Sequence, residues 1–442
     1  MNRRAQTLPH YREVWMPFRR SSAVIAIAGV VALSAAVAGE LRAVAAASPP
    51  DVVIGAILPL TGASAQTGAG LRAAQELAQD LVNGHVSYPL PMAGKSGLPH
   101  LGHARIRVVF GDSQGKPDQA RAVAESLITQ DHAVALIGTY ASSTTATASQ
   151  VAERYGIPFL NPDSSSPSLT ARGLKWFFRV TPHDGTFAEN FYQFLGELKN
   201  MKKADVRRIA VVGEDGLFGT GAGDAEEAAA KRYGYVVATR IAYPATTTEV
   251  NSELQRIKSS APDVVMIASY VPDALLFLRG FKEQNVPIKA IMAQDAGFID
   301  PSFIKSAGAD AEGIFTREVF SLDIKHRNQA VPLIDQLFRQ RFGGRPLDGN
   351  TARDIMGILV LADAIDRAGS TKPDAIRAAL QRTNIAGKLT LMPWNRIHFD
   401  AQGQNDGGVG IIEQIQNGKY ETVWPFDVAV AKPIWPMPPW RR

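Results

Sequence analysis

The chain contains no cysteine among its 442 residues. This absence excludes disulfide bonds, thiolate metal sites and cysteine nucleophiles. An oxidising compartment remains open, because a chain of this length buries a large core without covalent cross-links. The composition is otherwise that of a globular protein, with 45% hydrophobic and 20% charged residues, and the length suits two domains better than one.

Motifs of common enzymes are also scarce. The sequence has no G-x-x-x-x-G-K-S/T phosphate loop and no H-E-x-x-H zinc motif. Residues 68–73 satisfy G-x-G-x-x-A, a dinucleotide-binding motif. The first glycine of that motif must lie in the tight turn directly after a strand, whereas Gly68 comes about ten residues after the predicted strand ends. Small residues that ease a helix start against a sheet explain the pattern better. We predict that the protein has no enzyme activity and binds no cofactor. A nucleotide-dependent enzyme is the alternative interpretation.

The first 47 residues differ from the rest. Five arginines precede an apolar run of small residues from Ala23 to Gly39, and the segment Ala43–Ala47 then reads as an A-x-A cleavage region. This order predicts a secretory signal peptide and a secreted protein. An uncleaved membrane anchor is the alternative, because about 17 apolar residues could just span a bilayer.

The basic charge of the chain lies mostly in this leader. Residues 1–47 carry six arginines and two glutamates, so they hold +4 of the total net charge of +5 and leave +1 for the remainder. A nearly neutral mature chain lacks the basic surface that nucleic-acid binding requires. The sequence therefore predicts no nucleic-acid partner.

From Asp51 onward, apolar runs alternate with amphipathic helical stretches. Continuous Val, Ile and Ala runs between helices are typical of parallel strands covered on both faces, so we predict a doubly wound α/β fold. The predicted strands are Asp51–Leu58, Ile106–Phe110, Ala133–Gly138, Ile157–Asn161, Arg208–Gly213, Tyr235–Ala242, Val264–Ala268 and Ile288–Met292.

The alternation stops near Val180–Asp184 and then starts again, which predicts two lobes. The last third supplies helices and short strands that must return to complete both. We expect a first lobe from residues 51–181 and 319–398, and a second lobe from residues 182–318 and 399–442. A chain that passes between lobes several times makes a hinge from a few connecting segments.

One segment fits neither lobe. Residues Asn83–Ala104 contain three prolines and four glycines, so we predict a long surface loop. His100 and His103 lie in it three residues apart, a spacing that could hold a metal. With no third ligand in view, solvent-exposed histidines are the better interpretation, and we predict no metal site.

Polar loops follow the predicted strands at their carboxyl ends, where open α/β sheets bind ligands. Thr139–Thr145 and Pro162–Pro167 are hydroxyl clusters that open helices or turns, and free backbone N–H groups there attract a carboxylate. In the second lobe, strand ends carry Phe218, Tyr270 and Asp295. An acid and two aromatics opposite hydroxyls suit a small ligand with one anionic and one cationic or apolar end. An ordinary helix N-cap is the alternative for Asp295.

Four segments together resemble the periplasmic solute-binding proteins of branched-chain amino acid ABC transporters. They are ILPLTGASAQTG (residues 57–68), the block Gly138–Gly173, EDGLFGTG (residues 214–221) and AKPIWPMP (residues 431–438). The resemblance covers the chain after Asp51. It implies a type I periplasmic binding protein: two Rossmann-like lobes, joined by a three-crossover hinge, that close like a clamshell around one ligand. LPLTG is then the turn after the first strand, and its match to a cell-wall sorting signal is accidental.

The resemblance also implies a ligand site. Ser142 and Ser165 match positions where hydroxyls hold the ligand carboxylate, and Ala141 and Asp163 stand in the same loops. Tyr270 and Asp295 match positions that cap the ligand ammonium from the second lobe. Phe218 matches an aromatic that covers the ligand side chain, and Thr67 stands where another aromatic is often found.

Two departures bear on the ligand. Thr67 removes one aromatic wall, which suits a larger or more polar pocket. Asp163 would repel a ligand carboxylate unless its side chain points away. We therefore expect a substrate-binding protein for a small polar solute, an aliphatic amino acid or a related amide, with a membrane permease and an ATPase as partners. A ligand sensor of the same fold that feeds a signalling partner is the alternative.

Overall fold

The computed structural model describes residues 49–201, 204–324 and 328–440. The predicted signal peptide lies outside these residues. Within them, no helix has the length and apolar content that a membrane crossing requires.

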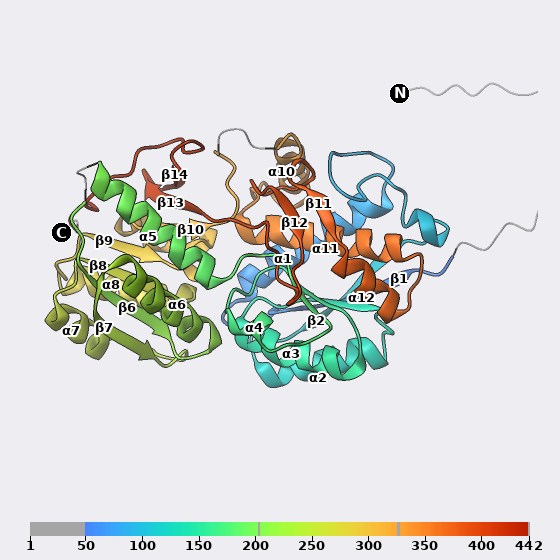
Figure 1. Ribbon diagram of the computed structural model, residues 1–442, viewed down its shortest axis with the longest axis horizontal. Coiled ribbons are helices and arrows are strands. Elements are labelled where there is room, and N and C mark those ends of the chain that lie inside the picture. Colours follow the sequence, from blue (N-terminus) through green and yellow to red (C-terminus); the bar gives the residue numbers. More distant parts are fainter. Residues whose placement is uncertain (1–48, 202–203, 325–327, 441–442) are drawn as a thin grey trace, which may run out of the picture. The chain divides into compact units, whose positions relative to one another are not determined.

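The first sheet is parallel and five-stranded, in the order β2-β1-β3-β4-β5 (Figure 1). Apolar residues of β1 alternate between two cores: Ile54 and Ala56 face one, and Val53 and Ile57 face the other. Both faces are therefore covered, as the continuous apolar runs predict. The strands are β1 (Val52–Leu58), β2 (Ile106–Asp112), β3 (Ala135–Gly138), β4 (Phe159–Asn161) and β5 (Phe177–Arg179).

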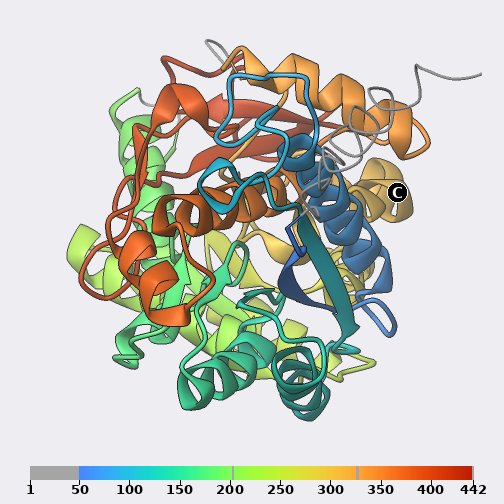
Figure 2. The same ribbon diagram turned by 90° about the vertical axis from the view of Figure 1, so that its right-hand side faces the viewer.

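Helices from two distant parts of the chain cover the first sheet. The nearby ones are α1 (Ala65–Asn83), η1 (Pro99–Leu101), α2 (Pro117–Thr129), α3 (Ser142–Tyr155) and α4 (Ser168–Ala171). The later ones are α10 (Ala330–Arg341), α11 (Gly349–Ala368) and α12 (Pro373–Gln381). Helix α11 lies beside α1 in both views (Figures 1 and 2) and contacts β4. Helix α11 is apolar on nearly every side, which its central place in the core explains.

The second sheet has seven strands in the order β14-β13-β10-β9-β8-β6-β7. Strands β6 to β10 are parallel, and β13 and β14 are antiparallel additions. The strands are β6 (Arg208–Glu214), β7 (Val236–Tyr243), β8 (Val264–Ala268), β9 (Ala290–Ala293), β10 (Phe315–Glu318), β13 (Ile411–Gln416) and β14 (Lys419–Trp424). The helices are α5 (Asp184–Asn200), α6 (Leu217–Tyr233), α7 (Asn251–Ser260), α8 (Val271–Glu283), η2 (Ala296–Phe298), α9 (Pro301–Ala307) and η3 (Gly308–Ala311).

The chain passes between the two sheets three times: after β5, after β10 and before β13. The first and third passages run together, because Asn405 donates its backbone N–H to Arg179 and its side-chain amide to Val180. This agrees with the predicted three-crossover hinge. The exact lobe limits at residues 181, 318 and 398 remain a prediction. A two-stranded hairpin, β11 (Asn384–Ala386) and β12 (Arg396–His398), and η4 (Gly387–Leu389) precede the third passage.

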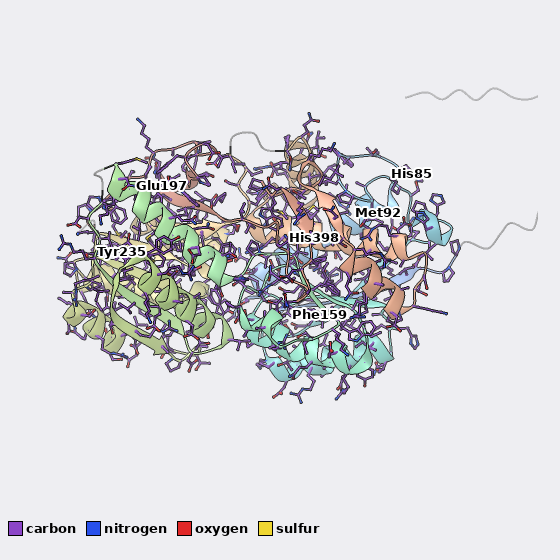
Figure 3. The ribbon with its side chains drawn as sticks, in the orientation of Figure 1. His85, Met92, Phe159, Glu197, Tyr235 and His398 are labelled. Atoms are coloured by element: carbon purple, nitrogen blue, oxygen red, sulfur yellow. The ribbon has the colours of Figure 1, made fainter. Side chains whose placement is uncertain are left out.

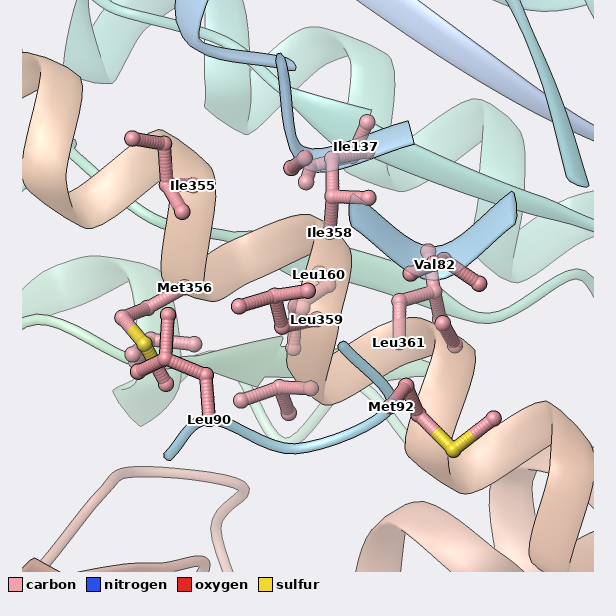
Figure 4. Packing of buried hydrophobic residues seen from close by; sticks show 14 of the residues in the cluster. Val82, Leu90, Met92, Ile137, Leu160, Ile355, Met356, Ile358, Leu359 and Leu361 are labelled. Atoms are coloured by element: carbon pink, nitrogen blue, oxygen red, sulfur yellow. The ribbon is translucent and has the colours of Figure 1, made fainter. Parts of the chain in front are cut away.

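The segment Asn83–Ala104 is not the open surface loop that its prolines and glycines predict. Leu90, Met92 and Leu98 are buried in the core between α1 and α11, where Leu90 and Met92 lie beside α11 (Figure 4). His85 in the same segment is exposed (Figure 3). The segment therefore acts as a folded cover over α11. The prediction failed because proline and glycine mark turns but do not report what the residues between them bury.

The two histidines of this segment have separate partners. His100 contacts the Asp366 carboxylate through its backbone N–H at 2.9 Å and its Nδ1 at 2.7 Å. His103 lies 3.2 Å from the Lys95 carbonyl oxygen. Among the described residues no group of three or more metal-binding side chains comes together.

Gly68 allows α1 to start against the turn after β1. A Cβ at Gly68 would fall inside contact distance of the Pro59 carbonyl oxygen, which is backbone and cannot rotate away. We expect Gly68→Ala to lower the free energy of unfolding by about 1–3 kcal/mol through overpacking. Gly196→Ala in α5, where a Cβ meets nothing within 4 Å, is the matched control. It should raise stability by about 0.5–1 kcal/mol, as in other exposed helices. Urea unfolding measures both, and equal effects would contradict the packing account.

Candidate functional site

A small cavity lies where the carboxyl ends of strands from both sheets meet. Six of the eight predicted site residues line it: Ser142, Asp163, Ser165, Phe218, Tyr270 and Asp295. Four further residues complete its lining: Tyr140, Ser164, Ala296 and Arg353. The sequence thus located the loops that form the cavity, although a ligand role for each residue remains a prediction.

The hydroxyl loops hold each other in place. The Thr139 hydroxyl lies 2.5 Å from that of Thr144 and 2.8 Å from that of Thr145, and Thr145 contacts Ser164 at 2.6 Å. Most of these hydroxyls are therefore occupied within the loops. The Ser142 hydroxyl near the start of α3 accepts the Ser166 N–H at 3.3 Å and has no other partner among the described residues.

The start of α3 provides donors for an anion. Ala141 is the N-cap residue of this helix, and its side chain makes no capping hydrogen bond. The first backbone N–H groups of a helix lack intrahelical acceptors, and the helix dipole favours negative charge there. The α3 start and the Ser142 hydroxyl together suit a carboxylate.

Three aromatic rings form one wall. The Tyr270 ring centroid lies 5.9 Å from that of Tyr140 and 5.5 Å from that of Phe218. Tyr140 comes from the first sheet, whereas Tyr270 and Phe218 come from the second. Tyr140 was not among the predicted site residues, although it stands in the hydroxyl loop that the sequence singled out.

Asp295 has one carboxylate oxygen held and one available. Its Oδ2 lies 2.5 Å from Nη1 of Arg317 and 3.5 Å from Nη1 of Arg353. Its Oδ1 has no partner among the described residues. The side chain also makes no N-cap hydrogen bond to η2, so helix capping does not explain this residue. The Asp295 carboxyl group is held through Oδ2 by two guanidinium groups, which leaves Oδ1 for a cation in the cavity.

Asp163 is paired, which weakens the repulsion expected between it and a ligand carboxylate. Its Oδ1 accepts from Nε of Arg353 at 3.0 Å. Burial raises the pKa of Asp163, and it raises the pKa of neighbouring Asp354 far more, since Asp354 also faces the Asp163 charge. Asp354 accepts a hydrogen bond from Gln75.

Arg317 at the end of β10 connects the cavity to the first passage between the sheets. The side chain is fully buried and donates to Asp184 at 3.0 Å and to Asp295 at 2.5 Å. Its guanidinium lies 3.4 Å from the Phe187 ring centroid. Burial raises the pKa of Asp184 to about 6, although Arg317 opposes the shift. The sequence analysis did not find Arg317, because it did not predict strand β10.

Two predicted site residues lie outside this cavity. The Thr67 hydroxyl donates to Asp300 Oδ2 at 2.6 Å, a contact between α1 and the segment after η2. Ala141 lines a neighbouring groove that it shares with Tyr140 and Tyr270. Thr67 therefore joins the two halves of the molecule directly. Its role in shaping the ligand pocket remains a prediction.

The sequence profile of the family described as periplasmic binding protein matches residues 51–419. The chain belongs to this family. The Leu/Ile/Val-binding protein homolog 8 of Brucella abortus is 27% identical over 391 residues, which cover 86% of this chain and 92% of that protein.

Solved structures share the fold of this periplasmic binding protein. The leucine binding protein LivK of Thermotoga maritima superposes with a TM-score of 0.72 at 21% identity, over 84% of this chain and 97% of that one. LivJ of Streptococcus pneumoniae, solved in complex with isoleucine, gives a TM-score of 0.70 at 20% identity, over 87% and 100%. The type I periplasmic binding protein fold, predicted from the sequence, is confirmed.

One serine of this periplasmic binding protein has the spacing of a catalytic nucleophile. Residues 111–115 read G-D-S-Q-G, which matches the G-x-S-x-G elbow and which the sequence analysis missed. Ser113 is buried, and its hydroxyl accepts only the Gly115 N–H at 3.4 Å. No described histidine or carboxylate contacts it. The nucleophile would lack a base, so the geometry gives no support to hydrolysis here.

Glu226 makes the stability of this periplasmic binding protein depend on pH. Burial raises the pKa of its carboxyl from 4.5 to about 7, and one of its oxygens has no hydrogen-bond partner. Between these two values the folded protein keeps a proton that the unfolded chain has released, so stability falls as the pH rises.

We expect Glu226→Gln to be more stable than the wild type by roughly 3 kcal/mol at pH 8, because glutamine has no proton to lose. The gain should disappear below about pH 4.5, the ordinary value for glutamate. Urea unfolding across this pH range measures the difference. The neighbouring Glu227→Gln is the control and should leave the pH dependence unchanged. A gain for Glu226→Gln that stays constant with pH would refute the account.

Proposed function

We propose that this protein is the solute-binding component of an ABC transporter and that it holds an α-amino acid in the cavity between its two sheets. The proposed anion site is the start of α3 with the Ser142 hydroxyl, and Ser165 lines the same cavity. A free oxygen of Asp295 faces it from the second sheet. A buried zwitterion needs both charges paired, because an isolated buried ion is very costly. This pairing of opposite ends is the observation that carries the proposal.

The proposed binding cycle uses contacts from both sheets. Ser142, Ser165 and Tyr140 approach the solute from the first sheet, and Phe218, Tyr270 and Asp295 approach it from the second. A solute that contacts both halves stabilises the closed arrangement, in which the halves lie close together. Binding therefore shifts the equilibrium from the open to the closed arrangement. Three connecting segments that act as a hinge would allow that movement. The protein performs no chemistry on its solute in this account.

The proposal places the protein in the periplasm, exported by the leader of residues 1–47. Its partners are a membrane permease and an ATPase that receive and import the solute. The family assignment supports this localisation and these partners, as do relatives named for Leu, Ile and Val binding. Aliphatic and branched-chain amino acids and related amides are the first solutes to test.

A thermal-shift screen of the purified protein tests the proposal. The ligands are the twenty amino acids, simple amides, small carboxylates and dinucleotides. A ligand that binds only the folded state at 100 times its Kd stabilises by about 2.7 kcal/mol and raises the melting temperature. We expect a rise with one group of amino acids. A rise with carboxylates alone would end the role of Asp295 as an ammonium partner. A rise with dinucleotides, together with turnover, would replace the proposal by an enzyme.

A further inference from the structure

Arg353 lines the cavity, although the side chain of an aliphatic amino acid has no acceptor for its guanidinium group. It belongs to α11, whose N-cap Asp348 fixes the start of the helix by accepting the Thr351 N–H. Its side chain is 1% exposed and lines the cavity beside Asp163 and Asp295. A fully buried arginine at a ligand cavity requires an account of each of its donors.

Two of the three guanidinium nitrogens have acceptors. Nε donates to Asp163 Oδ1 at 3.0 Å, and Nη2 donates to Asn350 Oδ1. Nη1 is buried without a hydrogen-bond partner. Nη1 lies 3.5 Å from Asp295 Oδ2, which is too far for a good hydrogen bond. A buried donor left unpaired is costly, so Nη1 points to an acceptor that the bound solute supplies.

We infer that Nη1 of Arg353 donates to a neutral carbonyl oxygen on the solute side chain, so that the solute is an amino acid with a carboxamide or ureido side chain. This inference rests on the proposed function, in which the α-carboxylate lies at the start of α3 and the ammonium lies at Asp295. The group that accepts the hydrogen bond from Nη1 must then belong to the side chain of the solute.

Charge favours a neutral acceptor over a carboxylate. The Arg353 charge already interacts with Glu318, Asp163 and Asp295. A side-chain carboxylate at Nη1 would add a negative charge beside Asp163 and Asp295 and would be repelled by both. A carboxamide oxygen accepts the hydrogen bond without that repulsion. The cavity lining also suits a polar solute side chain, because only Phe218 and Ala296 among its ten residues lack polar side-chain atoms.

Three amino acids of nearly equal shape test the inference. Leucine, asparagine and aspartate differ mainly in the end group of the side chain, which is isopropyl, carboxamide or carboxylate. Isothermal titration calorimetry of the wild-type protein gives their three Kd values. We expect asparagine to bind at least about tenfold more tightly than leucine and than aspartate, because only it fills Nη1 without repulsion. Leucine equal to or tighter than asparagine overturns the inference and leaves the proposed function intact.

Arg353→Lys separates the role of Nη1 from the role of the charge. Lysine keeps a positive charge near Asp163 and Asp295 but has no planar fork. Asparagine should lose at least tenfold in affinity, and leucine should change less than threefold. An equal loss for both overturns the inference. If the variant does not fold, as its ligand-free melting curve would show, the wild-type ranking still decides. Binding of none of the three, by a protein that melts cooperatively and binds another class of solute, overturns the proposed function and this inference together.

Discussion

Arg317→Met is expected to lower the free energy of unfolding by about 3–5 kcal/mol, the usual cost of removing one partner from a buried ion pair. The substitution keeps most of the side-chain volume but leaves Asp184 and Asp295 without their closest cation. Both carboxylates are nearly or fully buried, so water cannot replace the guanidinium. The contact with the Phe187 ring would be lost as well. Urea unfolding of the ligand-free protein measures the change.

Arg339→Met is the matched control for Arg317→Met. Arg339 pairs with Asp335 at 2.7 Å on the surface of α10, and its side chain is 43% exposed. A surface pair of this kind contributes between about 0 and 1 kcal/mol. The account of the buried network therefore predicts a large difference between the two variants. Similar effects would show that the Arg317 pairs contribute no more than a surface pair.

Asp295→Asn is expected to weaken amino-acid binding by about 2–4 kcal/mol, which corresponds to roughly 30-fold to 1,000-fold in Kd. Asparagine keeps the size and shape of the aspartate side chain. It removes the negative charge that faces the solute ammonium. Calorimetric titration with the solute found in the thermal-shift screen measures the loss.

Asp366→Asn is the control for Asp295→Asn. Asp366 is also buried, but it accepts from the His100 N–H and does not line the cavity. Its substitution should change the Kd by less than threefold. The ligand-free melting temperature of both variants shows whether either has lost its fold. Near-normal affinity in a folded Asp295→Asn protein would end the assignment of Asp295 to the ammonium.

The sequence predicts the parallel strands well because these are buried on both faces. Val264–Ala268 is a continuous apolar run, and β8 has these same limits. Strand β10 was missed because Thr316, Arg317 and Glu318 make three of its four residues polar. Those side chains are buried by pairing with other parts of the chain, and no local pattern reports such pairing.

The candidate site could be predicted as far as it depends on where strands end. The loops after β3 and β4 carry Ser142 and Ser165, and both line the cavity. Arg317 could not be assigned, because its partner Asp184 lies 133 residues away. The sequence does contain a pattern from which Arg353 could have been predicted as a buried residue. It and Asp354 are charged residues in a helix that is otherwise almost entirely apolar between Ala352 and Ala362, which marks them as buried and paired.

The central claim is that one solute lies between the two sheets and contacts both. Calorimetric titration of the wild type, Ser142→Ala and Phe218→Ala tests it most directly, since the two residues approach the cavity from opposite sheets. The account predicts one solute per chain and a loss of at least about tenfold in affinity for each variant. The ligand-free melting curve of Phe218→Ala should move to lower temperature but stay cooperative, because the Phe218 ring is buried against Tyr270. One-to-one binding of an amino acid that neither substitution weakens would place the solute elsewhere and contradict the account.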